Sequence, residues 1–347
     1  MQEETKSEVA AATNLASARA GNRDAFSALI EPHRPELQVH CYRMLGSLHD
    51  AEDMVQETLL RAWRRLETYE GRASFRAWLY KIATNACLDM LKNQSRRTLP
   101  PAQIAASDPN QPPASPITEP IWLEPFPDDL LPVSHASPEA RYESRESITL
   151  AFLAALQALP ARQRAVLILR DVLDLRANEV ANILDFTVSA VNSALHRARS
   201  TLAKQYDVRG EETVKIPPPD ATVRKTLERY VRAWETADVD ALIALLREDV
   251  AFSMPPSPAW YQGRSAVRAF ISSNILAGDS RGRWRLVPTH ANARPAFAWY
   301  QRDATQIIYR AFAIQVVTLD TGLISNVTTF AIPTLFSYFG MPQELRV

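Results

Sequence analysis

The sequence DAEDMVQETLLRAW, residues 50–63, decides how the N-terminal third of this chain folds. Its apolar side chains recur at three- and four-residue spacing and therefore fall on one face of a helix, at Ala51, Val55, Leu59 and Ala62. The acidic side chains of Asp50, Asp53 and Glu57 fall on another face. The stretch predicts an amphipathic helix that packs into a small helical bundle and leaves an acidic face for solvent or for a partner.

Aromatic and basic residues interleave just after this helix, in YEGRASFRAWLYKIATN at residues 69–85. Aromatic faces stack on unpaired bases while cations follow the phosphates, so this composition is typical of a surface that holds single-stranded nucleic acid. Trp78 lies in helical register with Ile82, and we expect it in the core. The residues that we expect to contact a strand are Arg72, Phe75, Arg76, Tyr80, Lys81 and Asn85.

Residues 174–199 have the spacing of a helix-turn-helix, and an amphipathic helix that begins near Pro160 precedes them. Pro160 suits the first turn of one helix; a second helix is predicted over 176–184, and a third over 190–204 with Thr187 or Ser189 as N-cap. No carboxylate occurs between Phe186 and Tyr206, so the third helix offers an unopposed positive surface to a phosphate backbone. We predict that Val191, Leu195 and Leu202 point inward. The residues expected to reach DNA are Ser189, Asn192, Ser193, His196, Arg197 and Arg199.

The composition limits the remaining function classes. The 347 residues contain 39 Lys plus Arg and 39 Asp plus Glu, so any DNA contact has to use local patches rather than a global positive field. No run reaches the roughly 18 apolar residues of a membrane span, and the N-terminus has no long apolar core, so we expect a cytoplasmic protein. Cys41 and Cys87 predict reduced, buried thiols, and we expect no metal and no cofactor.

Prolines divide the chain into domains. Ten prolines fall between Arg97 and Pro138, which excludes helix from most of that stretch and predicts an extended linker. A second break lies at residues 214–220. We therefore expect a helical domain at 20–97, a Pro-rich linker at 98–137, a second helical domain at 138–208 and a third domain at 220–347.

The third domain changes character from helix to strand. Helices are predicted over 222–236, 239–247 and 265–275. Runs rich in β-branched and aromatic residues follow, and they predict antiparallel strands with a turn at 320–322: 283–288, 297–301, 305–319 and 324–332. The fold class is thus multidomain, with two all-α domains followed by an α+β domain.

Two of these regions together resemble one known family. The run from Leu45 to Arg97 resembles region 2 of the extracytoplasmic-function (ECF) sigma factors, and LPARQR at 159–164 followed by LHRAR at 195–199 resembles region 4. The resemblance implies that Asp50, Asp53, Gln56 and Glu57 face the beta-prime clamp helices of core RNA polymerase. It also implies that the 69–85 segment melts and captures the minus-ten element, and that region 4 reads the minus-thirty-five element and touches the beta flap. The expected function is promoter-specific transcription initiation as an alternative sigma factor, and not an enzymatic one.

Residues 220–347 resemble a SnoaL-like cone, on runs such as Tyr230–Trp234 and Asp249–Pro256. The resemblance implies a pocket, for which the polar candidates are Trp260, Tyr261, His290, Tyr300, Asp303 and Tyr309. No pair among them commits to acid and base roles, whereas Asp249 is expected to serve structure. We expect the cone to modulate activity in cis, and whether it binds a small molecule stays open.

The linker contains an apolar cluster, IWLEPFPDDLL at 121–131. Leaving a large apolar side chain in water forgoes about 1.5–3 kcal/mol of burial energy, so Trp122 and Phe126 are expected to dock on the third domain or on region 2. The alternative is a local cluster without regulatory meaning.

Two other classes of protein fit part of this pattern. A ligand-sensing helix-turn-helix repressor would use the third domain as its sensor, but it has no need of the two motifs at 50–63 and 69–85. An isomerase or cyclase fused to a DNA-binding module would require turnover that depends on His290 or Asp303.

Overall fold

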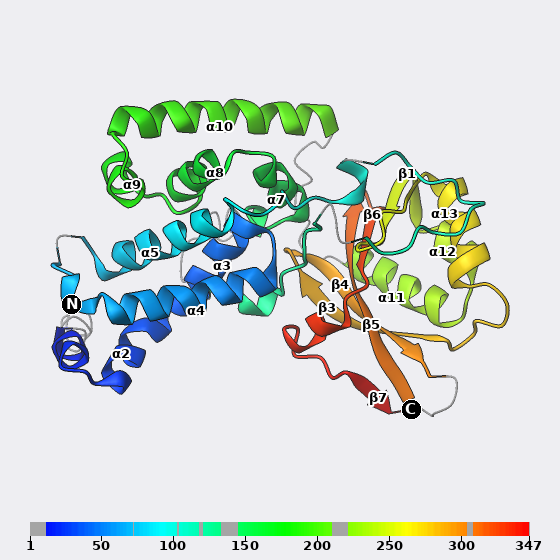
Figure 1. Cartoon of the computed structure of the whole chain (residues 1–347). Coiled ribbons are helices and arrows are strands. Elements are labelled where there is room, and N and C mark those ends of the chain that lie inside the picture. The colour runs from blue at the N-terminus through cyan, green and yellow to red at the C-terminus, as the bar shows by residue number, and fades with distance from the viewer. Residues whose placement is uncertain are drawn as a thin grey trace. The chain divides into compact units, whose positions relative to one another are not determined.

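The computed structural model describes residues 12–71, 73–102, 104–117, 121–132, 145–209, 221–303 and 308–346. They form two compact units, each built from separated pieces of the chain (Figure 1). The first unit comprises Met1–Ser95, Leu130–Ser147 and Ala155–Gly210, and the second comprises Arg96–Asp129, Ile148–Ala154 and Glu211–Val347. No helix among the described residues is long and apolar enough to cross a lipid bilayer.

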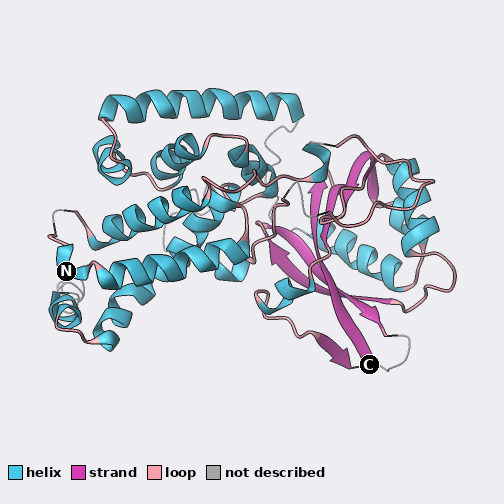
Figure 2. Cartoon of the chain, viewed as in Figure 1, coloured by secondary structure: helices cyan, strands magenta, loops and turns pink. Residues whose placement is uncertain are grey.

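The first unit is built from helices (Figure 2). Its N-terminal part contains α2 (Arg23–Ile30), η1 (Glu31–His33), α3 (Arg34–Leu45), α4 (Leu48–Arg64), η2 (Leu66–Thr68) and α5 (Phe75–Met90). Its C-terminal part contains α8 (Ala161–Leu167), the π-helical turn η5 (Ile168–Val172), α9 (Ala177–Leu184) and α10 (Val188–Arg209), while α7 (Leu150–Gln157) begins in the second unit and ends in the first.

Helix α4 contains the amphipathic stretch at residues 50–63. Gly46 ends α3 in the left-handed region, at φ 71°, and Ser47 then caps α4 by accepting a hydrogen bond from the amide of Asp50 at 3.1 Å. Leu48, Ala51, Val55, Thr58 and Ala62 are buried, so the predicted apolar face packs inward.

The helix-turn-helix consists of α9 and α10. Asp185 ends α9 in the left-handed region, at φ 54°, and the Thr187 hydroxyl caps α10 by accepting from the amide of Ala190 at 3.1 Å. Val191 and Leu195 are buried and Leu202 is half-buried, as the register predicts.

A buried arginine joins the two halves of the first unit. Arg164, in α8, is 2% exposed, and its guanidinium donates to the carbonyls of Met44 and Leu159 and to both the carbonyl and the side chain of Gln157. Burying a cation is costly unless it is hydrogen-bonded, and here the two terminal nitrogens of the guanidinium donate to backbone carbonyls of three residues and to the Gln157 side chain. This cluster fixes the end of α3 against the turn between α7 and α8.

The first unit also buries a neutral histidine between α3 and α5. The ring of His40 hydrogen-bonds the Thr84 hydroxyl at 2.9 Å and meets the Tyr80 ring edge-on, with centroids 5.0 Å apart. Burial lowers the pKa of His40 to about 3, and the nearby Arg43 cation lowers it further. In the unfolded chain the His40 imidazole binds a proton with the ordinary pKa of 6.5, whereas in the folded protein it stays neutral until about pH 3.

This histidine should make the first unit acid-sensitive. Because the pKa of His40 is lower in the folded state, its neutral imidazole contributes its full stabilisation above pH 6.5. The free energy of unfolding falls as the pH drops toward 3, by about 2 kcal/mol at pH 5. Amide hydrogen exchange of α3, corrected for the pH dependence of the intrinsic exchange rates, measures the loss of stability between pH 7 and pH 5. His40→Gln should remove this part of the loss, whereas replacing the exposed His196 by Gln should keep it. Equal losses in both variants would contradict the assignment.

The second unit holds one seven-stranded sheet with helices beside it (Figure 2). The strand order is β2-β1-β6-β5-β4-β3, and β7 pairs with β5. The strands are β1 (Leu246–Ser253), β2 (Trp260–Gln262), β3 (Trp284–Ala291), β4 (Arg294–Arg302), β5 (Ile308–Asp320), β6 (Leu323–Phe330) and β7 (Glu344–Arg346). The helices are α11 (Ala221–Glu235), α12 (Val239–Ile243), α13 (Arg264–Phe270) and the turns η6 (Ile271–Ile275) and η7 (Pro333–Ser337).

The sheet is mixed, because β1 lies parallel to β6 while the other pairs are antiparallel. The four predicted strands correspond to β3 through β6 and are antiparallel to one another. The predicted helix over 239–247 is too long: α12 ends at Ile243, and Leu246 already begins β1. The run LREDVAFS is amphipathic by either period, so only its pairing with β6 decides that it is a strand.

Residues 96–129, here called the docked segment, pack on the second unit. Trp122 is 5% exposed and its indole Nε1 donates to the carbonyl of Pro256 at 3.0 Å. Phe126 is fully buried; its amide donates to the side-chain Oδ1 of Asn292 at 3.0 Å, and its carbonyl accepts from the Asn292 amide at 2.9 Å. The proline pattern predicts an independent linker over 98–137, whereas most of it belongs to a folded unit. The described part of this segment has no α-helix, only the short 3-10 turns η3 (Pro100–Ala102) and η4 (Asp128–Leu130). A mostly extended backbone explains both observations, because such a segment can follow the surface of another domain.

Replacing Trp122 should release this segment. Trp122→Ala removes a buried ring and one hydrogen bond, which typically costs about 3 kcal/mol or more, so hydrogen exchange at Thr98 and Leu123, whose amides bond within the segment, should accelerate about a hundredfold. Trp122→Phe keeps most of the apolar area and should fall between this variant and the wild type. Unchanged exchange in Trp122→Ala would contradict docking through this side chain.

Candidate functional site

A groove runs between α4 and α5 on the first unit. It is an open hollow of about 720 Å³, and Asp53, Gln56 and Glu57 line it together with residues that the sequence reading missed: Met54, Leu60, Arg61, Ala86, Asp89 and Met90. Asp50, the fourth predicted residue, does not line it. Leu60 is 43% exposed, although leucine usually lies inside. Its position off the apolar stripe of α4 was the signal that could have identified it.

Charges in this groove are partly paired. The guanidinium of Arg61 donates to Glu57 at 2.6 Å, one helical turn away, and lies 3.5 Å from Asp89 on α5. The hydrogen bond with Glu57 raises the pKa of Arg61, so this cation stays charged. Asp53 is exposed and no ion pair to it occurs among the described residues. The groove therefore combines an accessible carboxylate with an exposed apolar side chain.

The residues predicted to hold a DNA strand are divided between surface and core. Phe75 is half-buried against Tyr69 and Trp78, with ring centroids 5.5 and 5.6 Å away. Arg76 donates to Glu36 at 2.7 Å, and Asn85 is half-buried. Arg72 lies outside the described residues.

Tyr80 is a core residue, contrary to its predicted role in strand contact. It is fully buried, its hydroxyl lies 3.3 Å from a Glu36 carboxylate oxygen, and burial raises the pKa of its phenol well above the ordinary value. Helix α5 contacts α3, α4 and α9, so it buries more than one face. The sequence period identified the face of Trp78 and Ile82 only, and this is why Tyr80 was misplaced.

Lys81 connects α5 to the helix-turn-helix. Its Nζ donates to the Asp185 carboxylate at 2.8 Å and to the carbonyl of Asn182 at 2.7 Å. The Asp185 side chain is 75% exposed, and such ion pairs contribute little because solvent screens them. This contact is therefore readily exchanged for another anion.

All six residues predicted to reach duplex DNA are exposed on α10: Ser189, Asn192, Ser193, His196, Arg197 and Arg199. The positive surface is not wholly unopposed, because Arg199 makes two hydrogen bonds to Asp171 of η5, at 2.7 and 2.8 Å. The helix-turn-helix thus presents amide, hydroxyl and guanidinium groups on one helix, the donor set that reads base edges in a major groove.

The cone has a cavity, but the predicted pocket residues do not line it. His290 is exposed, Asp303 pairs with Arg310 at 2.8 Å, and the hydroxyls of Tyr300 and Tyr309 donate to the carbonyls of Pro342 and Gly282. Trp260 donates to the carbonyl of Ile104 in the docked segment. The polar groups of Tyr300, Tyr309, Trp260 and Asp303 are thus used in local hydrogen bonds and an ion pair. Tyr261, also predicted, stacks on Phe270 with centroids 4.1 Å apart and lies outside the cavity wall.

The observed cavity has a volume of about 270 Å³, and its wall is largely apolar, with the aliphatic side chains of Met254 and Ile275 and five aromatic ones: Phe252, Phe270, Trp284, Trp299 and Phe312. Its polar lining groups are Asn274, Arg283, Gln301 and Thr329, and Pro113 of the docked segment also lines it. None of the described lining residues carries a carboxylate, an imidazole or a thiol. None of these described lining residues could therefore act as a general base.

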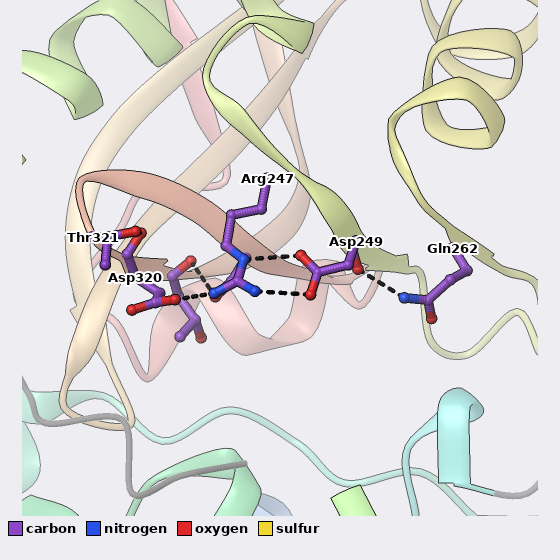
Figure 3. A network of polar contacts seen from close by, with 7 residues as sticks. Arg247, Asp249, Gln262, Asp320 and Thr321 are labelled. Carbon is purple, nitrogen blue, oxygen red and sulfur yellow. Dashed lines mark hydrogen bonds and ion pairs between the residues drawn. The ribbon is translucent and has the colours of Figure 1, made fainter. Parts of the chain in front are cut away.

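Asp249 lies outside the cavity, in the polar network of Figure 3. Arg247 donates to both carboxylate oxygens of Asp249 at 2.8 Å and also to Asp320, while Gln262 donates to the carbonyl of Asp249 at 2.7 Å. The arginine thereby ties β1 to the turn between β5 and β6. The Arg247 hydrogen bond lowers the pKa of Asp249, so this carboxylate is a structural anion.

An acidic groove beside an aromatic and basic helix, in one unit with a helix-turn-helix, defines a subunit that recognises promoters. Residues 29–97 match sigma-70 region 2, residues 149–202 match sigma-70 region 4, and residues 227–327 match the SnoaL-like domain. The ECF RNA polymerase sigma factor SigG of Mycobacterium tuberculosis is 43% identical over 327 residues, which cover 93% of this chain and 85% of SigG. The chain belongs to the ECF sigma-70 family.

Two further comparisons define how far the similarity extends. SigW of Bacillus subtilis is 29% identical over 185 residues, covering 53% of this chain and 90% of SigW. The crystal structure of the M. tuberculosis ECF sigma factor SigJ superposes with a TM-score of 0.54 at 22% identity, covering 89% of this chain and 97% of SigJ, and supports the fold alone.

Membership decides between the classes that the sequence left open. The protein is a sigma factor, a non-enzymatic subunit that binds core RNA polymerase and promoter DNA and directs transcription initiation. A repressor or a fused isomerase would not carry region 2.

Proposed function

We propose that the groove between α4 and α5 is the docking surface for core RNA polymerase. Asp53, Gln56 and Glu57 would face the beta-prime clamp helices, with Asp50 at the N-terminal end of the same helix. The observation that carries this proposal is the exposed Leu60 beside accessible carboxylates, because interfaces combine an apolar centre with a charged rim.

The two DNA elements would be bound by separate surfaces of the first unit. Arg72, Phe75, Arg76, Lys81 and Asn85 remain the candidates for the minus-ten strand, and Tyr80 supports them from the core. The six exposed residues of α10 would read the minus-thirty-five element in the major groove, with region 4 also touching the beta flap. Promoter binding and transcription initiation would take place in the cytoplasm, where the promoter DNA is.

The SnoaL-like domain would modulate transcription in cis. Support comes from the docked segment, which connects region 2 to region 4 in sequence and yet packs on the domain through Trp122 and Phe126. A change in the domain would thereby reach the connection between the two DNA-binding regions.

A truncation tests both parts of the proposal. The full chain and a chain ending at Val214 are each combined with core polymerase, and association and promoter output from a genomic-fragment library are measured separately. We expect both chains to associate, and the truncated chain to change output at least threefold without any other regulator. Equal output would contradict modulation in cis, whereas failed association of both chains would contradict the docking surface.

A further inference from the structure

The cavity of the second unit has a wall suited to one class of ligand. Apolar cavities of about 150 Å³ admit benzene, and pockets for drug-sized ligands start at about 300 Å³, so about 270 Å³ corresponds to one or two fused rings. Trp284 lies between Trp299 and Phe312, with ring centroids 5.3 and 5.2 Å away. Flat aromatic faces in such an arrangement favour a planar aromatic guest.

Two polar groups in the wall favour an anion or another acceptor on that guest. Trp299 is 1% exposed, and its indole Nε1 has no hydrogen-bond partner among the described residues, although a buried donor normally has one. Arg283 is the one cation among the described lining residues, and no carboxylate in the described part of the chain forms an ion pair with it. Its guanidinium lies 5.5 Å from the centre of the Trp284 ring.

The docked segment closes part of the same cavity. Pro113 lines it, and on either side of Pro113 the amides of Ser107 and Ile117 donate to the carbonyls of Trp260 and Pro256, at 2.8 and 3.1 Å. The Ser257 hydroxyl also donates to the carbonyl of Ala114 at 2.8 Å. A guest in the cavity would therefore touch the segment that connects the two DNA-binding regions.

We propose that this cavity binds a small aromatic carboxylate of one or two rings without transforming it, and that binding strengthens the packing of residues 104–117 on the second unit. The carboxylate pairs with Arg283, the rings lie among the aromatic side chains, and an acceptor atom satisfies Trp299. The inference deepens the proposed regulation in cis and rests on it only for the effect on transcription.

Calorimetry on the full chain tests the ligand class with two probes of equal size. 1-Naphthoate carries the carboxylate and 1-naphthalenemethanol does not. We expect 1-naphthoate to bind the wild type at least tenfold more tightly, since charged hydrogen bonds contribute about that factor. Arg283→Gln should abolish the difference between the probes, whereas Arg281→Gln, at an exposed arginine outside the cavity wall, should retain it. Trp299→Phe should weaken both probes severalfold.

Hydrogen exchange tests the coupling to the docked segment. At ten times its dissociation constant, 1-naphthoate should slow exchange of the Ser107 and Ile117 amides by up to about tenfold. The proposal is overturned if neither probe binds, if both bind equally, or if Arg283→Gln behaves like Arg281→Gln. Binding without slower exchange would overturn the coupling. Because no polymerase is present in these measurements, each failure is distinguishable from failure of the truncation experiment.

Discussion

Asp53→Lys should lower the affinity of this sigma factor for core RNA polymerase by about a hundredfold. Asp53 is an exposed carboxylate in the groove between α4 and α5, and we expect the partner to complement it with positive charge. Reversing the charge of Asp53 would then place like charges together, which costs several kcal/mol. Adding Leu60→Asp removes the exposed apolar side chain as well, and co-purification with the core enzyme should then be lost. Both positions are exposed, so folding should be unaffected.

The matched control is Glu67→Lys, which reverses an exposed acid of η2 outside the groove. Its affinity for the core enzyme should stay within about twofold of the wild type, because a charge at a distance acts only through a screened field. Asp53→Lys that binds as tightly as Glu67→Lys would exclude this groove as the docking surface.

The second large effect is expected on α10. Replacing Asn192 and Arg197 by Ala removes two exposed side chains with the geometry for base contacts, each worth about 1–3 kcal/mol of discrimination. We expect promoter binding by the holoenzyme to fall about a hundredfold or more, with sequence preference lost at the minus-thirty-five element. Association with the core enzyme should be retained.

The control here is Lys225→Ala, an exposed cation of α11 in the second unit. The salt dependence separates the two kinds of contact, because loss of a phosphate contact reduces the slope of affinity against salt by about one. The double variant could show a smaller salt dependence of affinity and an unchanged sequence preference. In that case Asn192 and Arg197 contact the phosphate backbone of DNA rather than its bases.

The sequence predicted those features that a local period or a local composition determines. Helix α4 and the helix-turn-helix were located from side-chain spacing, and the exposed residues of α10 followed from the register of Val191 and Leu195. Strands β3 to β6 were located from runs rich in β-branched and aromatic residues. Helix α4 buries one face, and a single buried face is what periodicity reveals; β4 and β5 contain consecutive buried residues, so their apolar composition rather than an alternation identified them.

The rest depended on contacts between distant parts of the chain. Tyr80 is buried because α5 has helices on several sides, and β1 is a strand because β6 lies beside it. The wall of the cavity combines residues from 113 to 329, so no local pattern could identify it. Polar side chains such as Tyr300 and Asp303 were attractive candidates, but neighbours in the fold already satisfy them.

The packing of residues 96–129 has a consequence for promoter architecture. Fully extended, this stretch could span about 110 Å. Region 2 and region 4 could then bind minus-ten and minus-thirty-five elements separated by many different distances. While the stretch packs on the SnoaL-like domain, most of that length is not available to separate region 2 from region 4. We therefore expect the wild type to accept a narrow range of spacer lengths, and Trp122→Ala to accept a broader one. The SnoaL-like domain would then determine which spacer lengths the protein accepts.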